Sequence, residues 1–214
     1  MEHTDLYIGG AWVPGAEGRR FDVLNPATEG GLASVASAGI ADADAALDAA
    51  QGAFADWAGR KPRERSEILR RAWELMTARL DEFAALITLE NGKAHADAMG
   101  EAAYAAEFFR WFAEEAVRAD GLITHAPASG ARIVVQHKPA GIAVLITPWN
   151  YPAAMGTRKI APALAAGCPV IIKPASETPL TMLALMPLLE EAGVPKGLVN
   201  VLPSRQTGAL VDHM

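Results

Sequence analysis

The clearest hydrophobic pattern lies between residues 140 and 178, where two short apolar runs flank a helical segment. The runs 142–146 and 169–172 are rich in apolar and β-branched residues and are followed by turn signals, which is typical of buried strands. Residues 153–166 between them have helical spacing and end at Gly167. A strand, a helix and a strand over this length predict a right-handed parallel crossover unit.

The pattern continues with a predicted helix over residues 180–192, a third parallel strand over 198–202 and a helix that starts near Gln206. The last helix is still in progress at Met214, so we expect the chain to be one portion of a longer protein. Open parallel sheets bind ligands just beyond the carboxyl ends of their strands. We therefore expect the functional site in the segments that follow the first two of these strands.

The first half of the chain is predominantly helical after a few short strands. Strands are predicted over residues 6–13 and 21–23. Apolar stripes of helical spacing predict one helix that starts near Asp42, one from Pro62 to near Asn91, and one over residues 94–119. A helical first half followed by an open parallel sheet is an α/β fold.

The helix predicted over residues 94–119 carries four aromatic residues at helical spacing: Tyr104, Phe108, Trp111 and Phe112. Such a stripe is more typical of a packing face than of a cofactor site, so we expect these rings in the core. The charged residues of the helices are expected to form solvated faces, among them Glu64, Arg65, Arg70, Arg71, Glu114 and Glu115. Residues 120–130 indicate a loop, and residues 131–137 alternate like an edge strand.

Composition narrows the functional classes. A net charge of −6 and a pI near 5.4 give no electrostatic reason to bind nucleic acid or an anionic membrane. The first ten residues lack a basic segment followed by an apolar one, and the single cysteine, Cys168, cannot form an internal disulfide, so a cytoplasmic location is expected. The five histidines are scattered without ligand spacing, so no metal site is expected.

Polar side chains follow the predicted strand ends. Asn150 lies between two prolines, where its amide can stabilise a developing oxyanion or serve only the turn. Lys173 can contact a phosphate or a ribose, or extend to water. Ser176 and Glu177 can cap the next helix or touch a nucleotide. Cys168 has no histidine near it in sequence, which favours a buried structural thiol over a nucleophile.

No G-x-G-x-x-G fingerprint occurs, so the usual dinucleotide-binding loop is not supported. The run ITPWNYPAAMGTRKIAPALAAGCPVIIKPASETPLTMLAL nevertheless resembles the aldehyde dehydrogenase family, whose cofactor domain also lacks that fingerprint. Earlier segments agree in order and spacing: YIGGAWV, FDVLNPATEG, AFADWAGRKPRERSEILRRAWEL, LITLENGK and AEFFRWFAEEA. Within the family, the chain is most similar to the succinate-semialdehyde dehydrogenases.

The resemblance implies roles for the matching residues. Asn150 in PWNYP matches the asparagine that stabilises the oxyanion. Arg158 in the TRK motif matches the arginine that binds the substrate carboxylate, and Lys173 matches the lysine that binds the adenosine ribose. The implied cofactor-binding residues are Pro148, Trp149, Asn150, Lys173, Pro174, Ala175 and Ser176.

Position 176 bears on the choice of cofactor. In the family a glutamate there favours NAD by binding the 2′-hydroxyl, whereas a small polar residue leaves room for a 2′-phosphate. Because the chain has Ser176, with Glu177 displaced by one, the resemblance implies NADP or NAD, with NADP favoured.

The resemblance also implies the organisation of the chain. Residues 1–119 match the strands and helices of a cofactor-binding domain, 120–139 a loop and edge strand of an oligomerisation region, and 140–214 an incomplete Rossmann-like βαβ part of the same domain. The complete protein is then expected to be a homodimer or homotetramer.

The catalytic cysteine and the general-base glutamate of the family lie downstream of Met214, so the chain alone is expected to be inactive. The resulting hypothesis is oxidation of a small aldehyde, succinate semialdehyde, to the acid by the complete enzyme. The alternative is a non-catalytic nucleotide-binding or assembly fragment.

Overall fold

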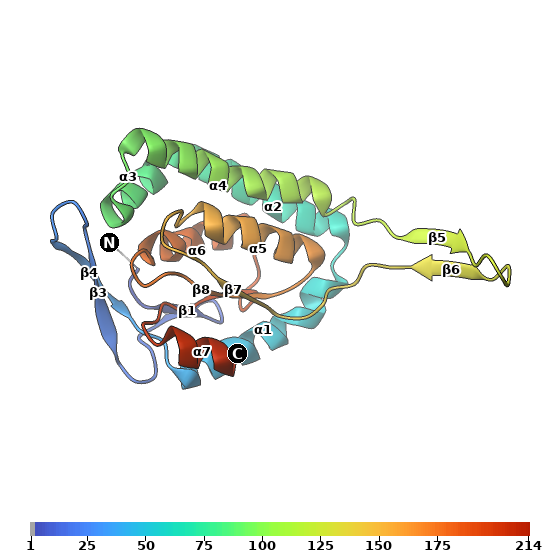
Figure 1. Ribbon diagram of the computed structural model, residues 1–214, viewed down its shortest axis with the longest axis horizontal. Coiled ribbons are helices and arrows are strands. Elements are labelled where there is room, and N and C mark those ends of the chain that lie inside the picture. Colours follow the sequence, from blue (N-terminus) through green and yellow to red (C-terminus); the bar gives the residue numbers. More distant parts are fainter. Residues whose placement is uncertain (1–2) are drawn as a thin grey trace.

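A five-stranded mixed sheet lies at the centre of the protein, for which a computed structural model describes residues 3–214 (Figure 1). The strand order is β2-β1-β9-β8-β7. The strands are β1 (Leu6–Ile8), β2 (Ala11–Val13), β7 (Ala143–Ile146), β8 (Val170–Lys173) and β9 (Val199–Val201). The predicted parallel pairing of the last three is confirmed, whereas the antiparallel β1 and β2 extend the same sheet in a way that the sequence pattern did not predict.

The prediction of one strand over residues 6–13 is wrong, because this segment is a hairpin. Gly9 and Gly10 have φ angles of 64° and 80°, which side chains disfavour and glycine adopts freely. The turn pairs β1 with β2, and Tyr7 of β1 also pairs with Val201 of β9. The N-terminal hairpin is thereby joined to the parallel strands.

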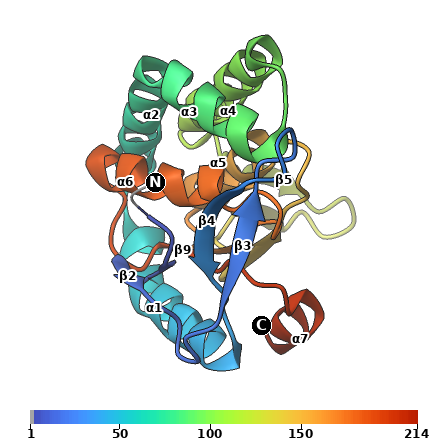
Figure 2. The same cartoon turned by 90° about the vertical axis from the view of Figure 1, so that its left-hand side faces the viewer.

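Helices cover both faces of the sheet (Figures 1 and 2). On one face lie α1 (Ile40–Gly59) and α7 (Thr207–His213), and on the other α5 (Ala154–Ala166) and α6 (Leu180–Ala192). An outer layer over α5 and α6 consists of α2 (Pro62–Ala78), α3 (Leu80–Asn91) and α4 (His95–Glu115). The α/β fold is confirmed. Within residues 3–214, no helix combines the length and the apolar character needed to cross a bilayer.

The central strand β8 is buried on both sides, which explains its continuous apolar run. Ile171 packs with Leu6 and Leu210 on the α1 side of the sheet, and Ile172 packs with Leu183 on the α6 side. Successive residues of a strand point to opposite faces, so a strand that is covered on both faces needs apolar residues at consecutive positions.

The single helix predicted from Pro62 to Asn91 is in fact two helices. The break is at Arg79, with φ −120° and ψ 24°, and it lets α3 turn to pack against α4 and α6. Arg79 forms an ion pair with Glu191 of α6. No glycine or proline marks the break in the sequence, so the apolar stripe passes through it uninterrupted.

Two predictions about side-chain burial on the helices are also wrong. Tyr104 and Trp111 were expected in the core but are 46% and 53% exposed, while Phe109 of the same helix is fully buried. Arg65 was expected on a solvated face but is 8% exposed, and its Nε donates to the carbonyl oxygen of Ala165 at 3.1 Å. A guanidinium can be buried in this way because it finds backbone acceptors.

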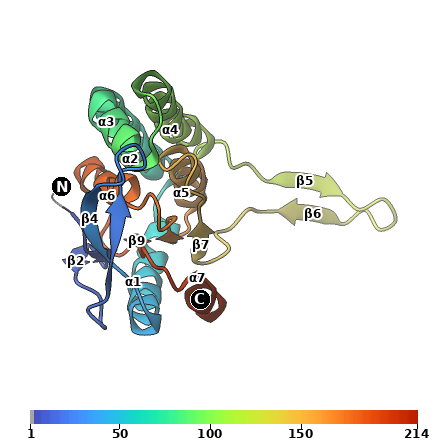
Figure 3. The same cartoon turned by 60° about the vertical axis from the view of Figure 1, so that its left-hand side comes forward.

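Two antiparallel hairpins lie outside the central sheet: β3 (Arg20–Leu24) with β4 (Gly31–Ala36), and β5 (Leu122–His125) with β6 (Arg132–Val135). The β5–β6 hairpin extends away from the rest of the protein (Figures 1 and 3). The strand expected within residues 131–137 is confirmed as β6, but residues 120–130 are not merely a loop because they contain β5. Every residue of both strands is exposed.

Candidate functional site

The expected site residues follow β7 and β8, which end side by side. Ile146 and Lys173 are register partners, and the backbone N–H of Thr147 donates to the carbonyl oxygen of Lys173 at 3.2 Å. The two loops that begin there come together again further on, where Trp149 and Ser176 line one cavity of about 390 Å³. The structure therefore brings together residues from the two segments that the sequence pattern singled out.

Lys173 is a buried cation at this edge of the sheet. The residue is 4% exposed, and its side-chain ammonium forms no hydrogen bond or ion pair with another residue of the range 3–214. Burial lowers the pKa of Lys173, although the nearby carboxylate of Glu177 works in the opposite direction. Such an ammonium retains donors for a ligand hydroxyl or phosphate. Pro174 and Ala175, which follow it, are buried.

Other residues hold the turn after β7 in place by hydrogen bonds to its backbone carbonyl groups, while the side chains of residues 148–150 are exposed. The carbonyl oxygen of Trp149 accepts hydrogen bonds from Asn91 Nδ2 at 2.9 Å and from Thr178 Oγ1 at 3.3 Å. The carbonyl oxygen of Asn150 accepts one from Lys93 Nζ at 3.1 Å. Pro148, Trp149 and Asn150 are all exposed, and the Asn150 amide forms no hydrogen bond with another residue of the described chain. That amide is free to donate to a ligand.

Arg158 lies apart from the cavity, in the second turn of α5. Its guanidinium is exposed and lies 5.7 Å from the ring centre of Phe108 of α4. The Phe108 ring packs in turn against Tyr104, with 4.7 Å between the ring centres. No carboxylate within residues 3–214 forms an ion pair with Arg158, so its charge remains available to a ligand.

A comparison with protein families identifies the family of this chain. Residues 12–214 match the model of the aldehyde dehydrogenase family. The chain belongs to the aldehyde dehydrogenase family. It is 53% identical to a succinate-semialdehyde dehydrogenase of Paenarthrobacter nicotinovorans over 84% of this chain and 40% of that protein. It is 47% identical to succinate-semialdehyde dehydrogenase [NADP(+)] 1 of Schizosaccharomyces pombe over 92% of this chain and 39% of that protein.

Solved structures agree with the family assignment. The crystal structure of succinate-semialdehyde dehydrogenase from Burkholderia pseudomallei matches 100% of this chain with a TM-score of 0.95 and 45% identity, and this chain covers 44% of that one. The chain thus spans about 40% of the length of the curated relatives it matches. The implied fold, the N-terminal portion of an aldehyde dehydrogenase, is confirmed.

Two buried carboxylates of this aldehyde dehydrogenase chain were missed by sequence reasoning. Glu101 of α4 accepts hydrogen bonds from the backbone N–H groups of Ala153 and Ala154 at 2.9 and 3.3 Å. Glu90 of α3 accepts those of Leu180 and Thr181 at 2.7 and 2.8 Å. Each carboxylate thereby caps the start of a helix, α5 or α6, that follows a site loop. Because each donor is distant in sequence from its carboxylate, no local motif marks them.

Burial raises the pKa of Glu90 from 4.5 to about 7, although the hydrogen bonds from Thr181 and Leu180 act in the opposite direction. Between these two pH values the folded protein binds more protons than the unfolded chain, so the contribution of Glu90 to stability falls as the pH rises. A difference of about 2.5 pKa units corresponds to roughly 3 kcal/mol. Glu90→Gln does not titrate in this range. Its free energy of unfolding, relative to that of wild type, should therefore rise by up to about this much as the pH increases from 4.5 to 8.

Urea unfolding of the two proteins across this pH range measures the difference. Glu82→Gln, a substitution of an exposed glutamate on the same helix, serves as the control and should show no such trend. A Glu90→Gln difference that stays constant with pH would contradict the raised pKa.

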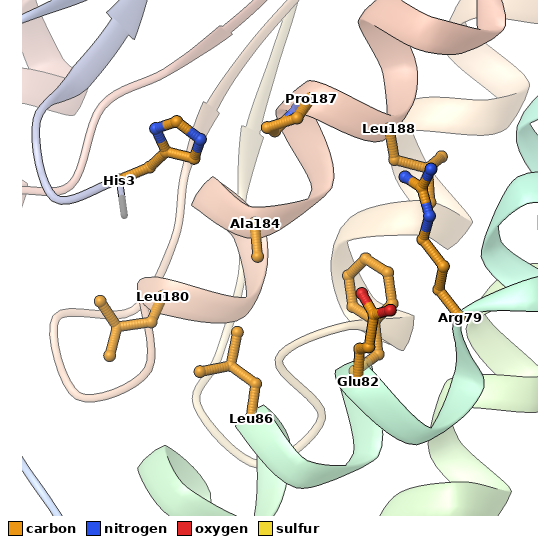
Figure 4. Close-up of a pocket in the computed structure, with 9 residues that line it drawn as sticks. His3, Arg79, Glu82, Leu86, Leu180, Ala184, Pro187 and Leu188 are labelled. Atoms are coloured by element: carbon orange, nitrogen blue, oxygen red, sulfur yellow. The ribbon is translucent and has the colours of Figure 1, made fainter. Parts of the chain in front are cut away.

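Other features lie away from the strand ends. A second cavity, of about 510 Å³, lies between α3 and α6, with Leu86 and Leu180 on opposite walls and His3 at its margin (Figure 4). None of the residues implied by the family resemblance lines it. Cys168 is 8% exposed just before β8, which confirms the prediction of a buried thiol.

Proposed function

We propose that these 214 residues are the N-terminal part of an NAD(P)-dependent enzyme that oxidises succinate semialdehyde to succinate. The observation that carries the proposal is that the loop after β7 presents an exposed Asn150 amide with no partner in the described chain, while the neighbouring strand β8 ends on the buried Lys173. One group suits an oxyanion and the other a nucleotide. The names of the relatives, succinate-semialdehyde dehydrogenases at 47–53% identity, support the same substrate.

In the proposed reaction, a cysteine thiolate supplied by the rest of the enzyme attacks the aldehyde carbon, and negative charge develops on the aldehyde oxygen. The Asn150 amide donates a hydrogen bond to that oxygen. NAD(P), when bound, would accept the hydride that leaves the aldehyde carbon, which leaves that carbon as a thioester of the cysteine. Water, activated by a base outside these residues, then hydrolyses the thioester to the acid, and Asn150 stabilises the oxyanion a second time.

Lys173 and the residues around it would hold the cofactor. The ammonium can donate to the ribose hydroxyls, and Pro148, Trp149, Pro174, Ala175 and Ser176 shape the two loops beside it. Lys173 is largely buried and forms no ion pair within residues 3–214, which is costly for a cation and supports a ligand-binding role. On α5, the guanidinium of Arg158 would donate two hydrogen bonds to the substrate carboxylate.

The test is a steady-state assay of the purified complete enzyme, followed by absorbance of the reduced cofactor. We expect reduction of NADP or NAD with succinate semialdehyde, and none with the 214-residue chain alone, because the nucleophile and base are supplied elsewhere. Failure of the complete enzyme to reduce either cofactor would contradict the proposal and favour a non-catalytic nucleotide-binding or assembly role.

Ser176 should set the cofactor preference. A glutamate there would place a carboxylate about 4 Å from a 2′-phosphate, a repulsion of roughly 1–4 kcal/mol for effective dielectric constants of about 80 to 20. We expect the wild-type enzyme to use NADP at least as well as NAD. Ser176→Glu should move the ratio of kcat/KM for the two cofactors toward NAD by about tenfold or more.

The same substitution at Ser129, an exposed residue between β5 and β6, adds an equal charge far from the strand ends and should leave the ratio unchanged. An unmoved ratio in Ser176→Glu would show that another residue discriminates between the cofactors.

We also propose the organisation of the complete protein. Residues 1–119 and 140–214 would form its cofactor-binding domain, and 120–139 part of an oligomerisation region. Exposed apolar side chains on the β5–β6 hairpin, such as Ile123 at 69% and Val134 at 55%, support assembly as a homodimer or homotetramer. A cytoplasmic location is supported by the use of a single, buried cysteine.

A further inference from the structure

A second set of contacts surrounds Asn150 from the side of α3 and α4. Lys93, in the connection between these helices, donates from Nζ to the carbonyl oxygen of Asn150 at 3.1 Å, and the same ammonium lies 3.9 Å from the ring centre of Tyr151. Lys93 also forms an ion pair with Glu101 of α4. The cation therefore contacts both Asn150 and Tyr151, in the turn that leads into α5.

Glu101 continues this network into α5. Its Oε1 accepts the N–H groups of Ala153 and Ala154, while its Oε2 accepts Lys93 Nζ. Both oxygens of the carboxylate are thus used. Glu101 thus holds the N–H groups three and four residues after Asn150, at the start of α5. Its partner Lys93 holds the carbonyl oxygen of Asn150 itself.

The burial of the pair makes it act as a unit. The Glu101 side chain is 1% exposed and that of Lys93 is 15% exposed. Removing one partner of a buried ion pair leaves an uncompensated charge, so neither side chain can move without loss to the other. Other ion pairs of α4, such as that of Glu107 with Arg110, are exposed and contact no site loop.

We propose that the Lys93–Glu101 pair positions Asn150 for oxyanion stabilisation, an inference that rests on the role proposed above for Asn150. An oxyanion donor is effective only when it lies 2.7–3.1 Å from the developing charge, and a displacement of about 1 Å can reduce the rate about 100-fold. The Asn150 amide is exposed and without a side-chain partner, so it depends on its own backbone for placement. Lys93 holds the carbonyl group of Asn150, and Glu101 holds the N–H groups of Ala153 and Ala154 that follow it.

The experiment is a double-mutant cycle on the complete enzyme. Lys93→Gln should lower kcat for succinate semialdehyde by about tenfold to 100-fold, with the dissociation constant for the reduced cofactor within about twofold of wild type. Lys93→Arg, which keeps the charge and the donors, should restore most of the activity. Glu107→Gln, which removes an exposed ion pair from the same helix, should leave kcat unchanged.

The decisive comparison is made in the Asn150→Ala background. A residue that acts through Asn150 has nothing left to position there, so Lys93→Gln should lower kcat no further. An equal loss with and without Asn150 would overturn the inference, because the lysine would then act on folding or on another group. An unchanged kcat in Lys93→Gln would overturn it as well.

The result also separates this inference from the function proposed above. If Asn150→Ala alone leaves kcat unchanged, the oxyanion role of Asn150 fails and the positioning role fails with it. If Asn150→Ala is impaired while Lys93→Gln is not, only the positioning role fails. Should Lys93→Gln not fold, as judged by circular dichroism, the same cycle with Glu101→Gln, which keeps one oxygen for the α5 N–H groups, gives the same three outcomes.

Discussion

Replacement of Asn150 by alanine should lower kcat for aldehyde oxidation by the complete enzyme by about 10²- to 10³-fold, which is the usual cost of losing one oxyanion donor. The amide is exposed at the end of β7 and has no partner within residues 3–214, so its removal disturbs no internal hydrogen bond. The loss should therefore appear in the chemical steps, measured by single-turnover kinetics.

Cofactor binding provides the control for this variant. The backbone carbonyl oxygen of Asn150, which accepts from Lys93, remains present in the alanine variant. The dissociation constant for the reduced cofactor, measured by fluorescence, should stay within about twofold of wild type. A kcat that falls less than about threefold would remove Asn150 from the catalytic role.

Replacement of Arg158 by alanine should raise KM for succinate semialdehyde by about tenfold or more. A hydrogen bond to a charged group contributes roughly 1.5–3 kcal/mol, and 1.36 kcal/mol corresponds to a factor of ten. The guanidinium is exposed, forms no ion pair within the described chain and lies over Phe108, so it is already oriented by the ring. Butanal, which has no carboxylate, should be oxidised by this variant almost as well as by wild type.

A matched control is Arg118→Ala, which removes another exposed arginine whose ion pairs within residues 3–214 are with two carboxylates near the end of α4. It should leave KM unchanged for both aldehydes. If Arg158→Ala lowers the oxidation of succinate semialdehyde and butanal equally, Arg158 supports the helix rather than the substrate, and the substrate assignment would rest on the names of the relatives alone.

The parallel core of the fold was predictable because its signals are local. A buried strand such as β8 needs consecutive apolar residues, and helix ends such as the one at Gly167 carry a residue that adopts a left-handed conformation. The break at Arg79 has no such signal, since it is caused by the packing of α3 against α4 and α6. Tertiary contacts decide such positions.

The sequence pattern also could not predict which aromatic residues of α4 are exposed. Tyr104 and Trp111 share a helical spacing with Phe108 and Phe112, whereas the fully buried ring of α4 is Phe109, which lies outside that stripe. The pattern alone cannot say which stripe of an aromatic-rich helix meets the core. In the structure the exposed rings lie on the helix whose Phe108 contacts Arg158. One ring of the stripe that resembled core, Phe108, thereby lies next to the proposed substrate residue.

The placement of the candidate site residues could be predicted in part. Lys173 ends β8, and Asn150 and Ser176 lie in the loops that follow β7 and β8. Because the pattern places these strand ends at one edge, the approach of the two loops could be predicted from topology. The roles of Glu90, Lys93 and Glu101 could not, because their partners are backbone groups about 50 to 90 residues further along the chain. Long-range capping leaves no trace in local spacing.

The most direct test of the central claim is a crystal structure of the complete enzyme with succinate semialdehyde and NADP bound, trapped by replacing the nucleophile. In that structure the Asn150 amide nitrogen should lie about 2.7–3.1 Å from the aldehyde oxygen, and the Arg158 guanidinium should donate two hydrogen bonds to the substrate carboxylate. A substrate carboxylate held elsewhere, with the Asn150 amide directed away from the aldehyde, would contradict the claim.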